Sequence, residues 1–346
     1  RIRRIMILMR VAFVGAVPFN LIFGGGETQL INTMNALSAE GVDASYYDYW
    51  DRNYKCDIIH VFGAHYWIYH WAMLAKCKGA KIVLSTISYN PNVSILYKIW
   101  GYIDPLIPVN TTFGLSRKFL YMADVLLPNS NIESDYIIKN FGVEKSKIKI
   151  IPNAADTRYA DASPEIFVQK YNLRDFVLCV GKIEPRKNQL NLIRALDNTN
   201  IKLVLIGDPI PQRMDYYSAV MEYVKKNKNI LYIRSMQYDS DLLSSAYAAS
   251  KVHVLLGKNE TPGIVNLEAG LAGANLVVAE CPPPREYLGD FADYCNANSL
   301  FDIRKTIMNA MAKPKSYKVR EFILKNYTWQ IVAKKTLNVY NSLFVK

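Results

Sequence analysis

The chain has 346 residues, 51% of them hydrophobic and 21% charged, a length and balance that allow two globular domains with separate cores. Its formal net charge of +12 is not gathered in a tail, and no DNA- or RNA-binding motif accompanies it, so we predict no nucleic-acid partner. The five cysteines form no CxxC pair and the four histidines form no HExxH motif, which disfavours a disulfide scaffold and a metal site.

The first half of the chain alternates apolar runs with amphipathic stretches. The basic residues 1–4 lack the apolar segment of a signal peptide, so residues 1–8 are predicted to precede the fold, and no apolar run is long enough to span a membrane. Strands are predicted at 10–17, 57–62, 81–85 and 124–128, and a helix at 27–40. Strands that alternate with helices predict a parallel sheet with helical crossovers.

The second half repeats this pattern, so the domain boundary is predicted near residue 150. Strands are predicted at 147–152, 176–181, 201–207, 230–234, 251–256 and 275–279, with helices at 188–196 and 214–227. A final amphipathic helix is predicted at 329–344, with Ile331, Leu337, Tyr340 and Leu343 on its apolar side. The fold class is therefore α/β, with two Rossmann-like parallel sheets whose ligands bind beyond the carboxyl ends of the strands.

Two loops between a strand and a helix carry residues suited to phosphate. The cluster Gly24-Gly25-Gly26 precedes a helix, where bare backbone and free N–H groups can approach an anion. It is not a GxGxxG fingerprint, which disfavours a dinucleotide-dependent oxidoreductase. After the strand that ends at Gly181, Lys182 and Lys187 could bracket a diphosphate and stabilise a nucleotide leaving group. An ordinary turn and a solvated charged loop are the alternatives.

A pair of glutamates gives the most specific signal. Glu260 follows a buried strand, and Glu268 lies in the next helix, predicted from Ile264 to about 271. The helix start near Gly263 directs N–H groups to the same region. Carboxylates accept hydrogen bonds from sugar and ribose hydroxyls, although two unrelated surface glutamates would look the same in the sequence.

In their order along nearly the whole chain, these motifs resemble the family 4 retaining glycosyltransferases of the GT-B fold, the E-x7-E group. The matching segments are Gly24–Glu27 (GGxE), 57–61 (D-hydrophobic-H), Asn153–Asp156 (NGVD), 181–188 (GR-x4-KN), 247–254 with the glutamate pair, 277–289, and Trp329 at the final helix. The resemblance implies two domains with a cleft between them, and a C-terminal helix that returns to the first domain. Residues 1–150 with 329–346 would bind the acceptor, and 151–328 the nucleotide-sugar donor.

The resemblance also implies a role for each motif residue. Lys182 and Lys187 would act with Glu260 in catalysis, Glu268 would accept the ribose hydroxyls, and the backbone at Gly263 and Ile264 would hold the sugar. The remaining donor-binding residues would be Gly181, Arg234, Ser235, Met236, Gly25 and Gly26. Transfer would retain the anomeric configuration and need neither metal nor cofactor beyond the UDP- or GDP-linked donor.

Some residues depart from the family pattern. The stretch Ser85–Ser88 lacks the histidine that many members carry there, so no protein base is assigned. Pro262 removes one backbone donor beside Glu260. Asp239-Ser240-Asp241 has the form of a metal-binding DxD motif, but its place before a helix favours an N-cap.

The acceptor is predicted to be a glycan or a lipid-linked sugar, in surface polysaccharide or lipopolysaccharide synthesis. Segment 89–121 mixes basic and aromatic residues, which is typical of peripheral membrane contact, while a partly buried helix pair is the alternative. The protein is expected in the cytoplasm, at the inner face of the membrane. A nucleotide-sugar epimerase or phosphorylase of the same fold, or a non-catalytic nucleotide-sugar-binding subunit, are the alternative functions.

Overall fold

The computed structural model describes residues 9–345 other than 20, 22, 107–108, 235, 238 and 262. The predicted extension at residues 1–8 lies outside this range. Two units divide the chain: unit 1 runs to Asn153 and resumes at Trp329, and unit 2 runs from Ala154 to Thr328. The sequence places this division at 150, within the segment that leaves the first sheet.

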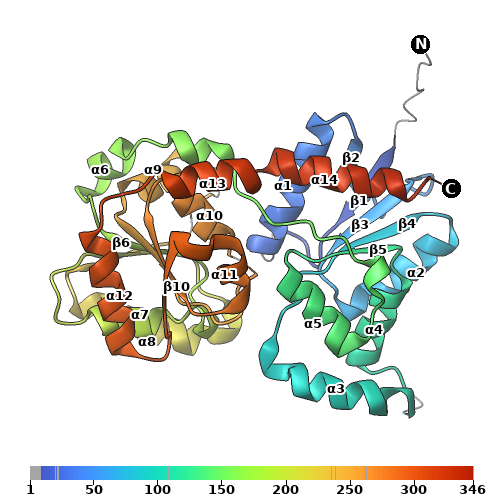
Figure 1. The fold of residues 1–346 in the computed structure, drawn as a ribbon, viewed down its shortest axis with the longest axis horizontal. Coiled ribbons are helices and arrows are strands. Elements are labelled where there is room, and N and C mark those ends of the chain that lie inside the picture. The colour runs from blue at the N-terminus through green and yellow to red at the C-terminus, as the bar shows by residue number, and fades with distance from the viewer. Residues whose placement is uncertain are drawn as a thin grey trace. The chain divides into compact units, whose positions relative to one another are not determined.

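Unit 1 is a five-stranded parallel sheet with helices on both faces (Figure 1). The strand order is β2 (Asp43–Tyr46), β1 (Arg10–Val14), β3 (Ile58–Phe62), β4 (Lys81–Ser85) and β5 (Val125–Leu127). Its helices are α1 (Gly25–Ala39), α2 (Tyr69–Cys77), α3 (Ser94–Ile103), α4 (Thr112–Met122), α5 (Asn131–Phe141) and α14 (Trp329–Ser342). Strands β1, β3, β4 and β5 are almost wholly buried, as expected for a parallel sheet that is covered on both faces.

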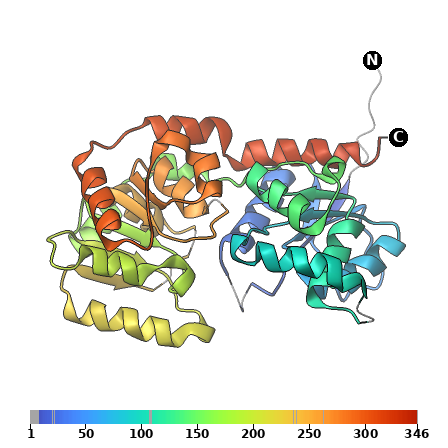
Figure 2. The ribbon, with the colours of Figure 1, turned by 60° about the horizontal axis from the view of Figure 1, so that its bottom comes forward.

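Unit 2 is a six-stranded parallel sheet that is also covered on both faces (Figure 2). The strand order is β11 (Ala292–Cys295), β10 (Asn275–Ala279), β9 (Val252–Leu255), β6 (Val177–Val180), β7 (Leu203–Ile206) and β8 (Ile230–Ile233). Its helices are α6 (Glu165–Tyr171), α7 (Gln189–Leu196), α8 (Met214–Lys226), α9 (Asp241–Ala249), α10 (Ile264–Leu271), α11 (Pro282–Leu288), α12 (Leu300–Ala312) and α13 (Lys318–Asn326). Alternate strand residues enter two separate apolar cores, with Leu178 on one face and Val177 on the other.

Two details of the predicted sheets are wrong. The sequence predicts a strand at 147–152, but this segment makes only an isolated bridge between Ile148 and Leu126. Lys149 and Ile151 donate backbone hydrogen bonds to β5 and its end, so the segment runs along the sheet edge without forming a ladder. The sequence also misses β2 and β11, the edge strands, whose residues are mostly half-buried and lack the apolar run of a central strand.

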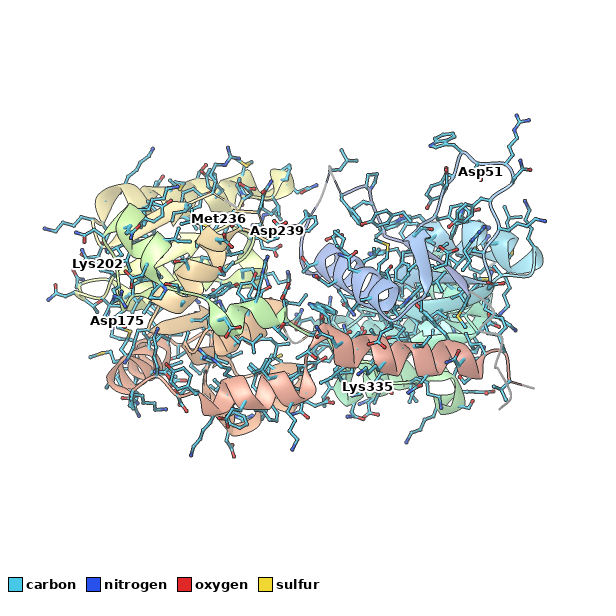
Figure 3. The ribbon with its side chains drawn as sticks, turned by 90° about the horizontal axis from the view of Figure 1, so that it is seen from above. Asp51, Asp175, Lys202, Met236, Asp239 and Lys335 are labelled. Atoms are coloured by element: carbon cyan, nitrogen blue, oxygen red, sulfur yellow. The ribbon has the colours of Figure 1, made fainter. Side chains whose placement is uncertain are left out.

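The C-terminal helix α14 packs on α1 within unit 1 (Figure 1). The buried His60 ring ties it to the sheet: Nδ1 shares a 2.6 Å hydrogen bond with the Tyr340 hydroxyl, and Nε2 a 2.9 Å bond with the Ser85 hydroxyl. Burial lowers the pKa of His60 to about 3, so the ring is neutral. The opposite side of α14 carries the exposed Lys334 and Lys335, which is labelled in Figure 3.

Candidate functional site

The loop after β6 is shaped by two close backbone approaches. Gly181 has φ of 148°, and a Cβ on Gly207, at the end of the neighbouring strand β7, would lie 2.0 Å from the Gly181 carbonyl oxygen. Only glycine fits at Gly207 for this reason. The loop then turns through Asn188, in the left-handed conformation at φ 59°, whose side-chain amide donates to the Ala297 carbonyl. These constraints fix the backbone that carries Lys187.

Lys187 reaches across to the loop that follows β9. Its Nζ lies 2.8 Å from Oε1 of Glu260, and the Arg186 guanidinium donates to the same oxygen at 2.9 Å. The Lys187 side chain is 12% exposed and that of Glu260 only 6%. Burial alone would raise the pKa of Glu260, but Lys187 and Arg186 outweigh it and hold that pKa below its ordinary value. Glu260 is therefore ionised and held between two cations.

The Glu260 carboxyl is placed by two glycines. A Cβ on Gly257 would lie 2.2 Å from Oε1, so the side chain folds back over bare backbone there. Gly263, at φ 83°, is the N-cap of α10, and its Cβ position lies 3.6 Å from Oε2 of Glu260. The N–H groups of Gly263 and Ile264, at the start of α10, lack acceptors within that helix, and the Gly263 backbone lies close to the Glu260 carboxylate.

Glu268 is buried inside α10 and has a different partner. Its Oε2 accepts a 2.8 Å hydrogen bond from the Tyr247 hydroxyl. Burial raises the pKa of Glu268 to about 7, against the opposing effects of Tyr247 and of Arg158. Its carboxyl is therefore close to half-ionised at neutral pH, in contrast with Glu260.

Within unit 2 the structure brings Lys187, Glu260, Gly181 and Gly263 together. The Lys182 ammonium makes no ion pair with any residue that the structure describes. Arg234 is exposed and pairs with Asp208, and Met236 packs against an apolar core close to Asp239 (Figure 3). Gly25 and Gly26 belong to unit 1, in the first turn of α1, and Ser235 falls outside the described residues.

Unit 1 has a cavity of about 170 Å³ at the glycine cluster. Gly26 and Glu27 of α1 line it together with His65, which follows β3, and Ile87, which follows β4. Burial lowers the pKa of His65, with Glu27 opposing this effect. The sequence offers no histidine after 81–85 for this region. The structure supplies His65 from the adjacent strand end, a position three residues after a buried apolar run that could have identified it.

The Asp239-Ser240-Asp241 motif has a structural role. The Ser240 hydroxyl accepts a hydrogen bond from the Leu243 N–H and caps α9, so the N-cap prediction is confirmed. Across the described residues, no cluster of three His, Cys, Asp or Glu side chains could ligate a metal ion. Within the same range, no helix combines the length and hydrophobicity needed to cross a bilayer.

Two family models match the chain. Residues 44–159 match the model described as Glycosyltransferase Family 4, and residues 165–320 the model described as Glycosyl transferases group 1. Together they span most of both units.

Curated relatives match parts of the chain. An N-acetylgalactosamine-N,N'-diacetylbacillosaminyl-diphospho-undecaprenol 4-alpha-N-acetylgalactosaminyltransferase from Campylobacter jejuni is 32% identical over 29% of this chain and 29% of its own length. The lipopolysaccharide 1,2-N-acetylglucosaminetransferase of Salmonella typhimurium is 21% identical over 71% of this chain and 66% of its own length. O-antigen chain mannosyltransferase B of Escherichia coli is 25% identical over 66% of this chain and 63% of its own length. The match thus spans less than two thirds of each of these relatives.

Solved structures share the fold over nearly the whole chain. Anabaena HepE in complex with UDP and glucose superposes with a TM-score of 0.76 and 13% identity, covering 96% of this chain and 100% of that one. Sucrose-phosphate synthase from Thermosynechococcus elongatus superposes with a TM-score of 0.73 and 16% identity, covering 97% and 99%. The predicted α/β class with two Rossmann-like sheets is confirmed.

Proposed function

Because the chain belongs to glycosyltransferase family 4, we propose that it moves a sugar from a nucleoside-diphosphate sugar to a glycan or lipid-linked acceptor in surface polysaccharide synthesis. Transfer retains the anomeric configuration and uses neither a metal ion nor another cofactor. The observation that carries this proposal is the ion pair between Lys187 and Glu260 at the carboxyl ends of β6 and β9. Ligands of open parallel sheets bind beyond such strand ends.

The charges at this site suit departure of a nucleoside diphosphate. An ammonium group has three N–H donors, and Glu260 engages one side of Lys187, so further donors remain for phosphate oxygens. Lys182, without an ion pair among the described residues, adds a second cation on the same loop. Positive charge held in a partly buried site stabilises the negative charge that develops on the leaving diphosphate. These two lysines take the place that a metal ion has in other phosphate sites.

Glu260 accepts hydroxyl hydrogen bonds from the donor sugar in this proposal, and the N–H groups of Gly263 and Ile264 complete the sugar site. Its ionised state supports this role, since a carboxylate is a stronger acceptor than a carboxylic acid. Glu268 accepts the two ribose hydroxyls, and Tyr247 holds its carboxyl in position. UDP- and GDP-linked sugars are the proposed donors, with the base near residues 234–236.

The relatives named above support a surface-glycan acceptor, because their names specify an undecaprenol-linked saccharide, lipopolysaccharide and O-antigen. An epimerase, a phosphorylase or a non-catalytic subunit is not favoured, since these relatives are transferases.

Unit 1 also supports a peripheral membrane contact on the cytoplasmic face. Helix α3 and the turn after it expose a row of aliphatic side chains, here called the α3 face: Ile95 (76% exposed), Leu96, Ile99, Ile103 and Leu106. Lys98 is exposed on the same helix, and Lys118 is exposed on α4. The sequence assigns this contact to the basic and aromatic residues of 89–121 together, but two of these aromatic residues, Tyr97 and Trp100, pack against the core of unit 1. Aliphatic groups with flanking lysines suit an anionic bilayer surface.

A donor screen with matched variants tests the proposed function. UDP-, GDP-, ADP- and CMP-sugars are compared by thermal shift, where a donor well above its Kd should raise stability. Lys187→Met should abolish the shift given by the donor that binds. Lys202→Met is the control, because Lys202 of unit 2 is exposed and its ammonium donates to the Asn229 side chain (Figure 3). No shift with any donor, or an equal shift in both variants, would contradict the proposal.

A further inference from the structure

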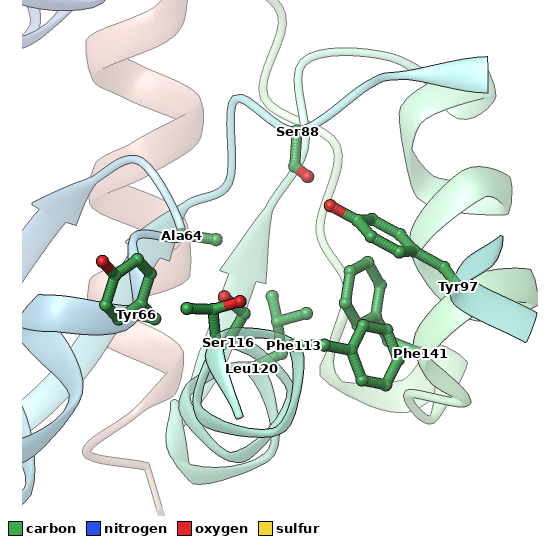
Figure 4. Close-up of a pocket in the computed structure, with 9 residues that line it drawn as sticks. Ala64, Tyr66, Ser88, Tyr97, Phe113, Ser116, Leu120 and Phe141 are labelled. Atoms are coloured by element: carbon green, nitrogen blue, oxygen red, sulfur yellow. The ribbon is translucent and has the colours of Figure 1, made fainter. Parts of the chain in front are cut away.

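Unit 1 contains a second cavity, of about 260 Å³, that the proposed donor site does not use (Figure 4). It is lined from α3 and α4 by Tyr97, Phe113 and Ser116, and from the ends of β3 and β4 by Tyr66 and Ser88. Because all of these residues belong to unit 1, the cavity is formed without unit 2.

Three aromatic rings form one wall of this cavity. The ring centroids of Tyr97, Phe113 and Phe141 lie 5.2–5.4 Å from one another, and the two phenylalanine rings are nearly parallel, at 15°. Aromatic rings present flat apolar surfaces that suit the C–H face of a sugar as well as other apolar groups. The wall by itself therefore leaves the class of ligand open.

Hydroxyl groups around the same cavity indicate which class of ligand it suits. Tyr66, Ser88, Tyr97 and Ser116 all line it, and their hydroxyls form no hydrogen bond within the part of the chain that the structure describes. The hydroxyl of Tyr97 points toward that of Ser88 (Figure 4). Free hydroxyls beside a ring wall match a ligand with both apolar faces and polar edges, which is the chemistry of a sugar ring and not of a hydrocarbon chain.

The two cavities of unit 1 share the same strand ends. After β3, Gly63 and His65 line the smaller cavity, whereas Ala64 and Tyr66 line the larger one. After β4, Ile87 lines the smaller cavity, and Ser88 the larger. Residues that are adjacent in the chain thus line two different cavities.

Ile87, which lines the smaller cavity next to Ser88 of the larger one, has an uncommon backbone conformation. Ile87 has φ of 43°, which is unfavourable for a β-branched residue. The buried Glu133 carboxylate fixes the residues on either side, accepting from the Thr86 hydroxyl at 2.5 Å and from the Ser88 N–H at 2.6 Å. It also accepts from the Asn129 N–H at 2.9 Å. Strain that is held by several buried hydrogen bonds is typical of a functional position.

We propose that the larger cavity is a second acceptor subsite, which binds the sugar ring next to the one that receives the transferred sugar in the smaller cavity. This inference rests on the proposed glycosyl transfer and deepens it: the acceptor carries at least two linked sugars. The smaller cavity, bordered by the glycine cluster and Glu27, holds the terminal ring. Tyr97 and Ser116 position the second ring and take no part in the chemistry.

Crystal soaking tests the subsite independently of transfer. Crystals of the full chain are soaked separately in concentrated maltose, cellobiose, lactose and chitobiose. We expect a sugar ring stacked on Tyr97 or Phe113 in the larger cavity with at least one of these probes. The absence of sugar density there with all four would overturn the proposal, even if donor binding is intact.

Kinetics separate this subsite from the donor site. With the donor identified by thermal shift, p-nitrophenyl glycosides of the same four disaccharides and of their monosaccharides serve as acceptors. Tyr97→Phe and Ser116→Ala should each raise the KM of the accepted disaccharide about fivefold per lost hydrogen bond. The KM of the monosaccharide and donor hydrolysis by water should not change. Tyr69→Phe is the control, since Tyr69 packs on the same core without lining the cavity.

Equal effects on monosaccharide and disaccharide would show a general loss of structure and overturn the subsite. If the wild type does not hydrolyse the donor at all, that result would instead contradict the proposed function. The soaking experiment would still test the subsite.

Discussion

Lys187 and Glu260 come from loops after two strands, β6 and β9, and form an ion pair of 2.8 Å that is almost closed to solvent. Arg186 adds a second cation on the same carboxylate oxygen. The donor diphosphate would therefore enter a site whose main cation is already engaged. In the proposed function, Lys187 would be shared between Glu260 and phosphate, which would couple the sugar end of the donor to its leaving group.

The pair itself can be tested by a double-mutant cycle. Lys187→Met leaves the buried Glu260 with the half-exposed Arg186 as its cation, and should destabilise unit 2 by about 1–3 kcal/mol. Adding Glu260→Gln should recover part of this loss, because the uncompensated charge is gone. Urea unfolding followed by circular dichroism gives the four free energies. Strictly additive effects would mean that the two side chains do not interact in solution.

Donor binding should depend on pH through Glu268. The pKa of Glu268 is raised to about 7, so its carboxyl takes up a proton as the pH falls below 7. Only the ionised form accepts from both ribose hydroxyls, so the Kd of the nucleotide should rise about tenfold per pH unit below 7 and level off above 8. Titration calorimetry of the nucleotide between pH 5.5 and 8.5 measures this.

Tyr247→Phe gives the matched comparison for that pH profile. Its hydroxyl donates to Glu268 and lowers the pKa, so its removal should shift the midpoint to higher pH. A Kd that is flat with pH in the wild type would contradict the ribose role of Glu268.

His60 should make unit 1 sensitive to acid. Its pKa falls from 6.5 to about 3 on folding, so the unfolded chain binds a proton first as the pH drops below 6.5. Stability is therefore present above pH 6.5 and is lost below it, by about 1.4 kcal/mol per pH unit from this one residue.

Tryptophan fluorescence follows unit 1 selectively in this experiment. All five tryptophans belong to unit 1, at positions 50, 67, 71, 100 and 329. Urea unfolding at pH 7.5, 6 and 5 should show the free energy of unfolding falling with pH. The His60→Gln variant should be less stable at pH 7.5, but its free energy of unfolding should fall less steeply with pH. An unchanged slope in His60→Gln would assign the acid sensitivity to other groups.

Much of the fold could be predicted because it depends on local pattern. The bounds of β4, β10 and α10 follow directly from apolar runs and a helix start at glycine. The buried side of α14 could not be predicted in the same way. Ile331 and Leu337, which the sequence places on that side, are only partly buried, whereas Thr336 is fully buried. The Thr336 hydroxyl bonds to the Val332 carbonyl, so a polar residue can face the core.

The candidate site was predicted in part for the same reason. Motif spacing identified Lys187 and Glu260, and the structure places them in contact. The sequence did not identify Arg186 as a partner of Glu260, because the two are 74 positions apart and only the order of strands brings them together. It likewise missed His65 and Ile87, which meet because β3 and β4 are neighbours in the sheet.

The α3 face should bind anionic vesicles. Changing both Ile95 and Ile99 to Ser removes exposed aliphatic surface and should weaken co-sedimentation with phosphatidylglycerol vesicles about tenfold or more. Ile166→Ser, at an exposed position of unit 2, is the control and should bind as the wild type does. Equal binding by all three proteins would remove the α3 face from the account.

Turnover of the donor is the direct test of the proposed glycosyl transfer. The full chain is incubated with the donor selected by thermal shift and an acceptor panel, and both nucleotide release and the anomeric configuration of the product are followed by NMR. We predict release of the nucleoside diphosphate with retention, reduced at least about 100-fold in Glu260→Gln and unchanged in Glu165→Gln, which alters an exposed ion pair with Arg174. Inverted product, or full activity in Glu260→Gln, would contradict the account.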